Sequence, residues 1–309
     1  QKEELMASLK HLRIRIRTVK STQKITSAMK MVAAAKLRRS QERVEAVRPY
    51  DSAMQEMVSH LLNESRQDLA KEPLLLTGHE DLHVHLLIVV TTDRGLCGGF
   101  NGAIVREAKS VIRTLQGQGK TVKIFCLGRK GQTLLRAEFG NLIVETIPHG
   151  HKTNQGKSTE NFSDALEFST KLQGMLIKKE FGEASILFTI FHSALRQTIA
   201  HHYLIPFRLN WEEENVVLEA NFRKNALYEY EPGVDSLLDY LLPRSLAIEL
   251  YRVFLENNAS EQGARMTAMD NATRNAKEVI KRLELSYNQT RQAYITKELI
   301  EIISGSEAV

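Results

Sequence analysis

The stretch LMASLKHLRIRIRTV, residues 5–19, decides the fold of the amino-terminal part of the chain. Its large apolar residues, Leu5, Leu9, Leu12, Ile16 and Val19, are separated by four, three, four and three positions. This spacing is the heptad pattern that lines one face of an α-helix and joins it to a second helix. The pattern therefore predicts a long helix that packs in a coiled coil.

The apolar pattern weakens at residues 23–26, which predicts a slip of the contact face at that point. We expect the face to resume through Ile25, Met29, Val32, Leu37, Val44 and Val47. A helix over residues 5–48 would be about 66 Å long. Pro49 is expected to kink or end this helix, because proline removes a backbone donor.

The carboxy-terminal part shows a similar heptad spacing. It runs through Leu246, Leu250, Val253, Asn257, Ser260, Ala264 and Thr267, and later through Ala272, Ala276, Val279 and Leu283. A helix over residues 244–303 would be about 90 Å long. Helices this long rarely stand alone, so the two terminal helices are expected to form a coiled coil with each other. Small residues dominate this seam, which predicts a slim, weakly self-stabilised rod.

The middle of the chain is richer in turns. All 17 glycines lie at or after Gly78, and prolines are absent before Pro49 and after Pro243. The pattern predicts strands over residues 84–92, 122–127, 142–147 and 184–191, and helices over 101–115, 130–139 and 160–179. Such alternation indicates an α/β domain with a mostly parallel sheet. Residues 149–159 and 210–224 are expected to be polar loops.

The composition is that of a globular protein. The 309 residues are 42% hydrophobic and 26% charged, which excludes collagen-like, disulfide-scaffold and wholly disordered classes. The apolar run Leu86–Val90 is far shorter than the roughly 20 residues that a membrane-spanning helix needs. A secretory signal peptide is not expected, since the amino-terminus is charged. Two cysteines, Cys97 and Cys126, favour a reducing compartment.

Positive charge is concentrated at one end. Residues 1–50 contain 13 Lys/Arg and 4 Asp/Glu, a net charge of +9, whereas the whole chain carries +5. Such asymmetry indicates an acidic partner, either a nucleic acid or an acidic protein surface. The cations lie all around the expected helix rather than in one stripe, which disfavours a binder of duplex nucleic acid and leaves a solvated face or a fit to an acidic protein ring.

Two glycine-containing segments raise the question of nucleotide binding. Gly95, Gly98, Gly99 and Gly102 do not match the G-x-G-x-x-G spacing of dinucleotide sites. The loop at residues 150–158 has five residues between its glycines, where a phosphate-binding loop has four. We therefore expect no cofactor.

The histidines and cysteines offer little chemistry. His83 and His85, like His149 and His151, are spaced by two, and no further metal-ligand spacing accompanies them. Packed or solvated histidines are the expectation, and a metal site is not. Cys97 lies near the start of an expected helix, where its pKa could fall. We favour a small residue in a tight turn.

Four segments resemble one protein family, the ATP synthase gamma subunits. VKSTQKITSAMKMVAAAKL, residues 19–37, resembles the amino-terminal helix of that family, and DRGLCGGFN, residues 93–101, resembles its glycine turn. ASEQGARMTAMDNAT, residues 259–273, and YNQTRQAYITKELIEIISG, residues 287–305, resemble its carboxy-terminal helix. One departure is Ser306, where the family usually has alanine after the glycine.

The resemblance implies an antiparallel coiled coil, formed by residues 1–77 and 244–309, and a Rossmann-like domain over residues 78–209. Residues 210–243 would connect the two and contact the ring of c-subunits. The implied function is that of a non-catalytic central rotor shaft. Its implied partners are three alpha and three beta subunits, an epsilon-type subunit and the c-ring. The alternatives are a Rossmann-type nucleotide-binding enzyme and a basic coiled-coil nucleic-acid binder.

The resemblance also implies roles for individual residues. Met29 matches a position that faces an acidic lever of the beta subunit. Arg291, Gln292 and Thr296 match positions that contact a catch loop of one beta subunit. Residues of the segment YEYEP match the contact with c-ring loops, namely Tyr228, Tyr230 and Glu231.

The implied location is the cytoplasmic side of a bacterial inner membrane, as a peripheral part of the ATP synthase. Met6 resembles a bacterial start, with residues 1–5 as an upstream extension. The alternative is the matrix side of the mitochondrial inner membrane.

Overall fold

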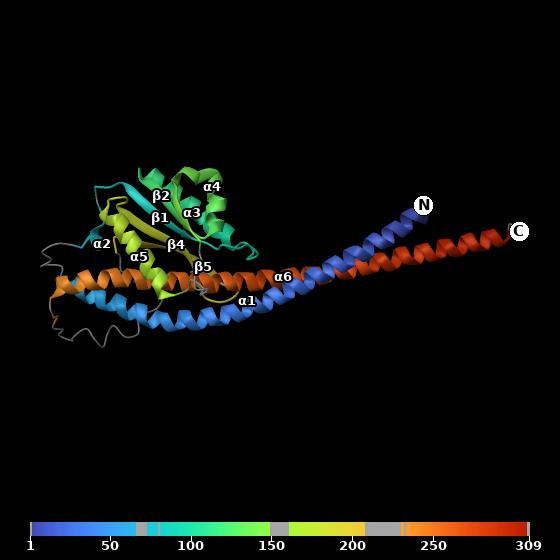
Figure 1. Ribbon diagram of the computed structural model, residues 1–309, viewed down its shortest axis with the longest axis horizontal. Coiled ribbons are helices and arrows are strands. Elements are labelled where there is room, and N and C mark those ends of the chain that lie inside the picture. Colours follow the sequence, from blue (N-terminus) through green and yellow to red (C-terminus); the bar gives the residue numbers. More distant parts are fainter. Residues whose placement is uncertain are drawn as a thin grey trace. The chain divides into compact units, whose positions relative to one another are not determined.

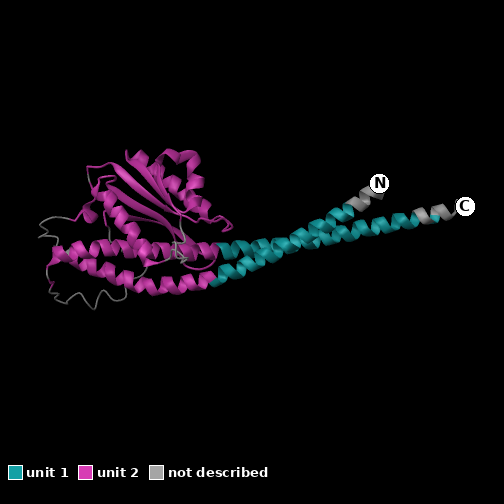
Figure 2. Ribbon diagram, viewed as in Figure 1, with its two compact units in different colours: residues 1–35, 265–309 teal, residues 36–264 magenta. Residues whose placement is uncertain are grey.

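The computed structural model describes residues 2–65, 73–79, 81–148, 161–207, 230–231 and 233–307. The chain divides into two compact units (Figure 2). One unit is formed by residues 1–35 and 265–309, and the other by residues 36–264. The expected loops at 149–159 and 210–224 lie outside the described residues.

Two long helices, α1 (Lys2–Ser65) and α6 (Val234–Glu307), supply residues to both units. Both helices are longer than the sequence predicts, because α1 continues through Pro49 and α6 begins ahead of Pro243. The prediction that Pro49 ends the first helix is therefore wrong. Buried side chains on both sides of the proline, such as Val44 and Met54, hold the helix in place, so packing outweighs the lost hydrogen bond.

The predicted slip in α1 is also wrong. Residues at least half-buried recur every three or four positions, through Leu9, Leu12, Ile16, Val19, Gln23, Thr26, Lys30, Ala33, Leu37, Ser40 and Val44. Ile25 and Val32, which were expected in the seam, are 58% and 57% exposed. The seam is continuous, but polar or small residues occupy several of its positions, so a search for large apolar residues loses it. On α6, Ile280 is buried in place of the expected Val279.

The five-stranded sheet has the order β3-β2-β1-β4-β5. Its strands are β1 (Val84–Val90), β2 (Thr121–Leu127), β3 (Ile143–Ile147), β4 (Glu183–Phe191) and β5 (Gln197–Ile205). The first four pair in parallel, and β5 pairs antiparallel to β4. The expected mostly parallel sheet is confirmed. Strand β5 is not predicted from the sequence, because its polar and histidine residues break the apolar run.

Helices cover both faces of the sheet (Figure 1). On one face, α3 (Phe100–Gly117) and α4 (Arg129–Phe139) pack on Leu87 and Val89 of β1. On the other, α5 (Phe162–Ile177) and the part of α6 near Leu250 pack on Leu86 and Ile88. Strand β1 is thus buried on both sides, as its continuous apolar run requires. A short helix α2 (Leu74–Thr77) and a 3-10 turn (Gly140–Leu142) complete the unit.

A third apolar cluster joins the two long helices within residues 36–264. Met54, Val58 and Leu61 of α1 pack there against Leu238 and Leu242 of α6. This packing explains why α1 extends so far beyond its predicted end.

Gly128 allows α4 to begin close against the end of β1. Its φ is +103°, and a Cβ atom there would lie 2.4 Å from the Thr91 carbonyl oxygen. The Thr91 hydroxyl in turn accepts the Gly131 N–H at 2.9 Å. Only glycine combines this backbone conformation with such a close approach.

We expect Gly128→Ala to lower the free energy of unfolding by about 2–4 kcal/mol, since it adds both strain and a clash. Gly174→Ala is the matched control, because Gly174 lies within α5 with open space around its Cα. That change should raise stability by about 0.5–1 kcal/mol. Urea unfolding of the two variants measures both effects, and equal midpoints would contradict the assignment.

Candidate functional site

The unit formed by residues 1–35 and 265–309 is an antiparallel helix pair (Figure 2). Side-chain contacts that join its helices include Thr26 with Thr273 at 2.8 Å, Lys30 with Asp270 at 2.6 Å, Lys20 with Glu284 at 2.7 Å, and Arg13 with Tyr287 at 2.8 Å. Residue numbers rise along α1 as those of their partners fall along α6, so the expected coiled coil of the terminal helices is confirmed.

Electrostatics strengthen one of these contacts. Lys30 and then Arg274 donate hydrogen bonds to the Asp270 carboxylate and hold its pKa at about 2. The carboxylate therefore remains charged throughout the physiological range.

The seam of the helix pair buries few large side chains. Its buried residues are Thr26, Ala33, Met269, Ala276 and Ile280. A seam of this kind brings the helices close together but removes little apolar surface from water. The outer face, by contrast, exposes large apolar residues, among them Ile25, Met31, Val32, Leu285, Leu299 and Ile300. These side chains are distributed along both helices, so they leave apolar surface that a partner enclosing the pair would cover.

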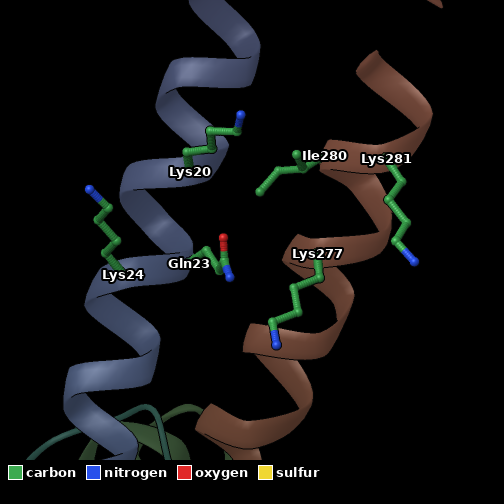
Figure 3. A pocket seen from close by; sticks show the side chains of 6 residues that line it. All are labelled: Lys20, Gln23, Lys24, Lys277, Ile280 and Lys281. Atoms are coloured by element: carbon green, nitrogen blue, oxygen red, sulfur yellow. The ribbon is translucent and has the colours of Figure 1, made fainter. Parts of the chain in front are cut away.

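A basic groove runs between the two helices (Figure 3). We call it the lysine groove: it has a volume of about 320 Å³ and is lined by Lys20, Gln23, Lys24, Lys277, Ile280 and Lys281. Lys20 pairs with Glu284. Among the described residues, Lys24, Lys277 and Lys281 have no anionic partner within ion-pair distance. Lys24 and Lys281 direct their ammonium groups away from the space between the helices (Figure 3), so positive charge lies on both flanks of the groove and favours an acidic partner.

The structure places the predicted beta-contact residues on the helix pair but does not bring them all together. Met29 is half-buried on α1, whereas Arg291, Gln292 and Thr296 are exposed on α6. The pairing of Lys30 with Asp270 puts Met29 about 30 Å along the axis from Arg291, at 1.5 Å per residue. A partner would therefore meet these residues at two separate levels.

The predicted c-ring residues lie just before α6. Tyr230 is half-buried against the third apolar cluster, and Glu231 is exposed. Tyr228 lies outside the described residues.

The glycine turn is filled by the chain's own polar groups. Asp93 accepts the Arg129 N–H at the start of α4 at 3.0 Å, which is the kind of donor that a phosphate would use. Asn101 accepts the Thr92 N–H at 3.1 Å and donates to the Thr92 hydroxyl at 2.8 Å. These contacts hold the turn together.

Buried and half-buried polar side chains at the start of β1 and β4 form an arrangement that the sequence does not predict. Glu183 lies 3.1 Å from His85 Nδ1, and Ser185 Oγ lies 2.7 Å from His85 Nε2. Acid, histidine and serine in this order resemble an activated nucleophile. His85 and Ser185 are fully buried inside the sheet, however, where a substrate cannot reach them. His201, whose Nε2 lies 2.8 Å from the same serine oxygen, completes a structural network.

Both cysteines are buried as free thiols. Asn101 donates to Cys97 Sγ at 3.2 Å, which confirms the interpretation of Cys97 as a small residue in a tight turn. Burial raises the pKa of Cys126 to about 11. The described residues contain no group of histidine, cysteine and acidic side chains that could hold a metal. In the described part of the chain, neither the two long helices nor the shorter ones contain an apolar stretch that could span a bilayer.

A sheet domain, together with a slim, basic helix pair that exposes apolar residues, defines a protein that docks into a larger assembly. Comparison with known proteins identifies the assembly. The family model described as "ATP synthase" matches residues 8–309. The ATP synthase gamma chain of Rhodospirillum rubrum is 48% identical over 98% of this chain and all of its own length. That of Gluconacetobacter diazotrophicus is 51% identical, with the same coverage.

The chain therefore belongs to the ATP synthase gamma chain family. A solved structure of Euglena gracilis mitochondrial ATP synthase contains a chain with the same fold. It matches with a TM-score of 0.66 and 21% identity, over 98% of this chain and 94% of that one.

We expect the buried histidine network to make stability depend on pH. Burial lowers the pKa of His85, and burial together with the charge of His85 lowers the pKa of His201 to about 4. Between pH 6.5 and 4 the unfolded chain binds more protons than the folded chain, so stability falls as pH falls through this window. We expect the thermal midpoint to drop by roughly 5 °C from pH 6.5 to 4.5.

His201→Gln is the informative variant, because glutamine keeps a polar group near Ser185 but does not titrate. Its midpoint should change less over the same pH range. An unchanged pH dependence in this variant would show that His201 is not the titrating group.

Proposed function

We propose that the chain is the central rotor shaft of a proton-translocating ATP synthase. The observation that carries this proposal is the outer surface of the helix pair, where unpaired lysines and large exposed apolar residues accompany a slim seam. A shaft that turns inside a ring of subunits needs a narrow cross-section and a surface that meets protein on all sides. Membership of the gamma chain family supports the same role.

In this role the chain holds no catalytic residue. The catalytic sites belong to the beta subunits, and the shaft makes the three of them differ in conformation. Rotation of the c-ring turns the shaft and changes which beta site is open. The partners are three alpha subunits, three beta subunits, an epsilon-type subunit and the c-ring, with one copy of this chain per complex.

Contacts at two levels of the helix pair would transmit the rotation. Met29 and the lysine groove lie within about 15 Å of each other along the axis and face the acidic lever of a beta subunit, to which the unpaired lysines of the groove and its flanks present positive charge. Arg291, Gln292 and Thr296 lie at the other level and contact the catch loop. An arginine fork and a glutamine amide suit a carboxylate and a backbone group respectively.

The residues ahead of α6 would meet the c-ring. Residues 210–243, with Tyr228, Tyr230 and Glu231, form this contact, and the sheet domain within residues 78–209 lies beside the epsilon-type subunit. Exposure of Glu231 and anchoring of Tyr230 in an apolar cluster support the assignment. The complex is attached to the cytoplasmic face of a bacterial inner membrane, as the bacterial origin of the relatives suggests.

Expression of the tagged chain with alpha and beta subunits tests the shaft role. We expect one copy of the chain to purify with three of each partner, in a complex that hydrolyses ATP. The chain alone should not hydrolyse ATP. Tight nucleotide binding by the isolated chain would favour the enzyme alternative. Salt-sensitive DNA binding without alpha and beta would favour the nucleic-acid alternative.

The catch contact gives a sharper prediction. We expect Arg291→Ala combined with Gln292→Ala to leave the complex assembled but to lower coupled ATP turnover several-fold. Each charge-assisted bond contributes roughly 1.5–3 kcal/mol, and about 1.4 kcal/mol corresponds to a factor of ten.

Asn288→Ala with Gln289→Ala is the matched control, because both residues are exposed on α6 about one turn earlier. Wild-type turnover of the Arg291 and Gln292 double variant under load would refute the catch assignment and leave the general shaft role.

A further inference from the structure

Four charged side chains of the two long helices meet within the unit formed by residues 36–264. Arg48 and Asp51 project from α1, and Arg252 and Glu256 project from α6. Arg48 Nη2 lies 2.8 Å from Glu256 Oε1, and Arg252 Nε lies 3.0 Å from Asp51 Oδ2. The Glu256 and Asp51 side chains are only 3% and 5% exposed. We call these four residues the charge ladder.

The charge ladder is also tied to the sheet. The Phe191 N–H, at the end of β4, donates to Glu256 Oε2 at 2.9 Å. Arg48 donates to the Phe191 carbonyl at 3.1 Å. The backbone of a single residue thus binds a side chain from each long helix. Because hydrogen bonds are directional, these contacts specify position more sharply than apolar packing does.

The order of charges along α1 differs from the order along α6. On α1, a cation at 48 is followed by an anion at 51. On α6, Glu249 precedes Arg252 by one turn and Glu256 follows it by one turn, so the signs alternate. Glu249 is buried close enough to Asp51 that its charge contributes to raising the pKa of Asp51, after the larger effect of burial.

Because the helices are antiparallel, a slip of one turn in either direction brings like charges together. In one direction Arg48 moves opposite Arg252, and Asp51 moves opposite Glu249. In the other direction Asp51 moves opposite Glu256. Buried like charges without a counter-ion are strongly unfavourable. We propose that the charge ladder positions α1 along α6 by excluding these two slipped registers.

The heptad seam does not supply this selectivity by itself. A seam of similar residues can pack almost as well after a shift along its axis, and buried polar groups are a known means of fixing register in coiled coils. For the proposed rotor, a fixed register keeps the contact residues of α1 and α6 at a constant axial offset. The register assignment concerns the chain alone, so it stands or falls separately from the rotor proposal.

The test is a double substitution that preserves pairing but removes the alternation. Asp51→Arg with Arg252→Asp leaves opposite charges facing each other in the native register. It also makes the ladder residues of α1 all positive and those of α6 all negative, so a slip of one turn no longer opposes like charges. The native register should then no longer be favoured over the two slipped registers.

Spin labels on the full-length chain report the register. Ser21→Cys on α1 and Gln289→Cys on α6 are exposed positions, offset along the axis. Each helix is continuous, so a slip of one turn changes the axial component of the label distance by about 5 Å. With the native ladder we expect a single narrow distance in double electron–electron resonance. With the exchanged ladder we expect a second distance, shifted by about that amount.

Lys171→Glu with Glu145→Lys is the matched control, because this pair joins α5 to β3 and involves neither long helix. It should leave the label distance unchanged. Circular dichroism reports whether each variant folds. If the exchanged ladder does not fold, Asp51→Leu with Arg252→Met, which removes the charge order with apolar side chains, is read instead. A single native distance in the folded variant would overturn the proposal.

Discussion

Between Ser245 and Ser260, α6 is buried almost throughout, because the sheet domain covers one side of the helix and α1 covers another. Leu246, Leu250 and Val253 enter the apolar core beneath β1, where each contributes about 1.5–3 kcal/mol by leaving water. The same stretch presents Arg252 and Glu256 to α1. One helix is therefore a layer of the sheet domain and half of the long helical pairing at once. The long helix α6 connects the residues of both units as one piece of secondary structure, and its packing supports everything else described above.

The helix pair keeps many of its large apolar side chains on the outside, where they are available to a partner. Inside a sheet domain, apolar residues such as Leu250 serve stability. In the helix pair, Thr26, Ala33 and Ala276 occupy the seam, while Ile25 and Val32 face outward. In a self-sufficient coiled coil large apolar residues fill the contact face throughout, whereas here small or polar residues alternate with them in the seam. Apolar side chains that do not pack within the chain are available for burial against a surrounding protein. The seam residues therefore stabilise the pair, whereas different, outward-facing residues would contribute to assembly of the complex.

The sequence predicted the helices, the parallel strands and the helical layers, because Leu9, Leu86 and Ile104 belong to strong periodic patterns. It failed where polar residues occupy structural positions. Gln23 and Lys30 interrupt the apolar pattern of the seam, and His201 and His202 interrupt that of β5. The partners of Arg48 lie more than a hundred positions away in the sequence, so local spacing does not predict them. Met29 and Arg291 are exposed or half-buried and were singled out by resemblance alone. Their role depends on another chain, and no periodic pattern within this chain encodes it.

The state of the two thiols has a practical consequence. Cys97 and Cys126 are enclosed by the sheet domain, and the raised pKa of Cys126 keeps its reactive thiolate scarce at neutral pH. A reagent that alkylates surface cysteines should therefore ignore the native chain. Fluorophores, gold particles or beads can then be attached at a single engineered position without removing either natural cysteine. Because the native cysteines are unreactive in the folded chain, a label at the engineered position alone can report rotation.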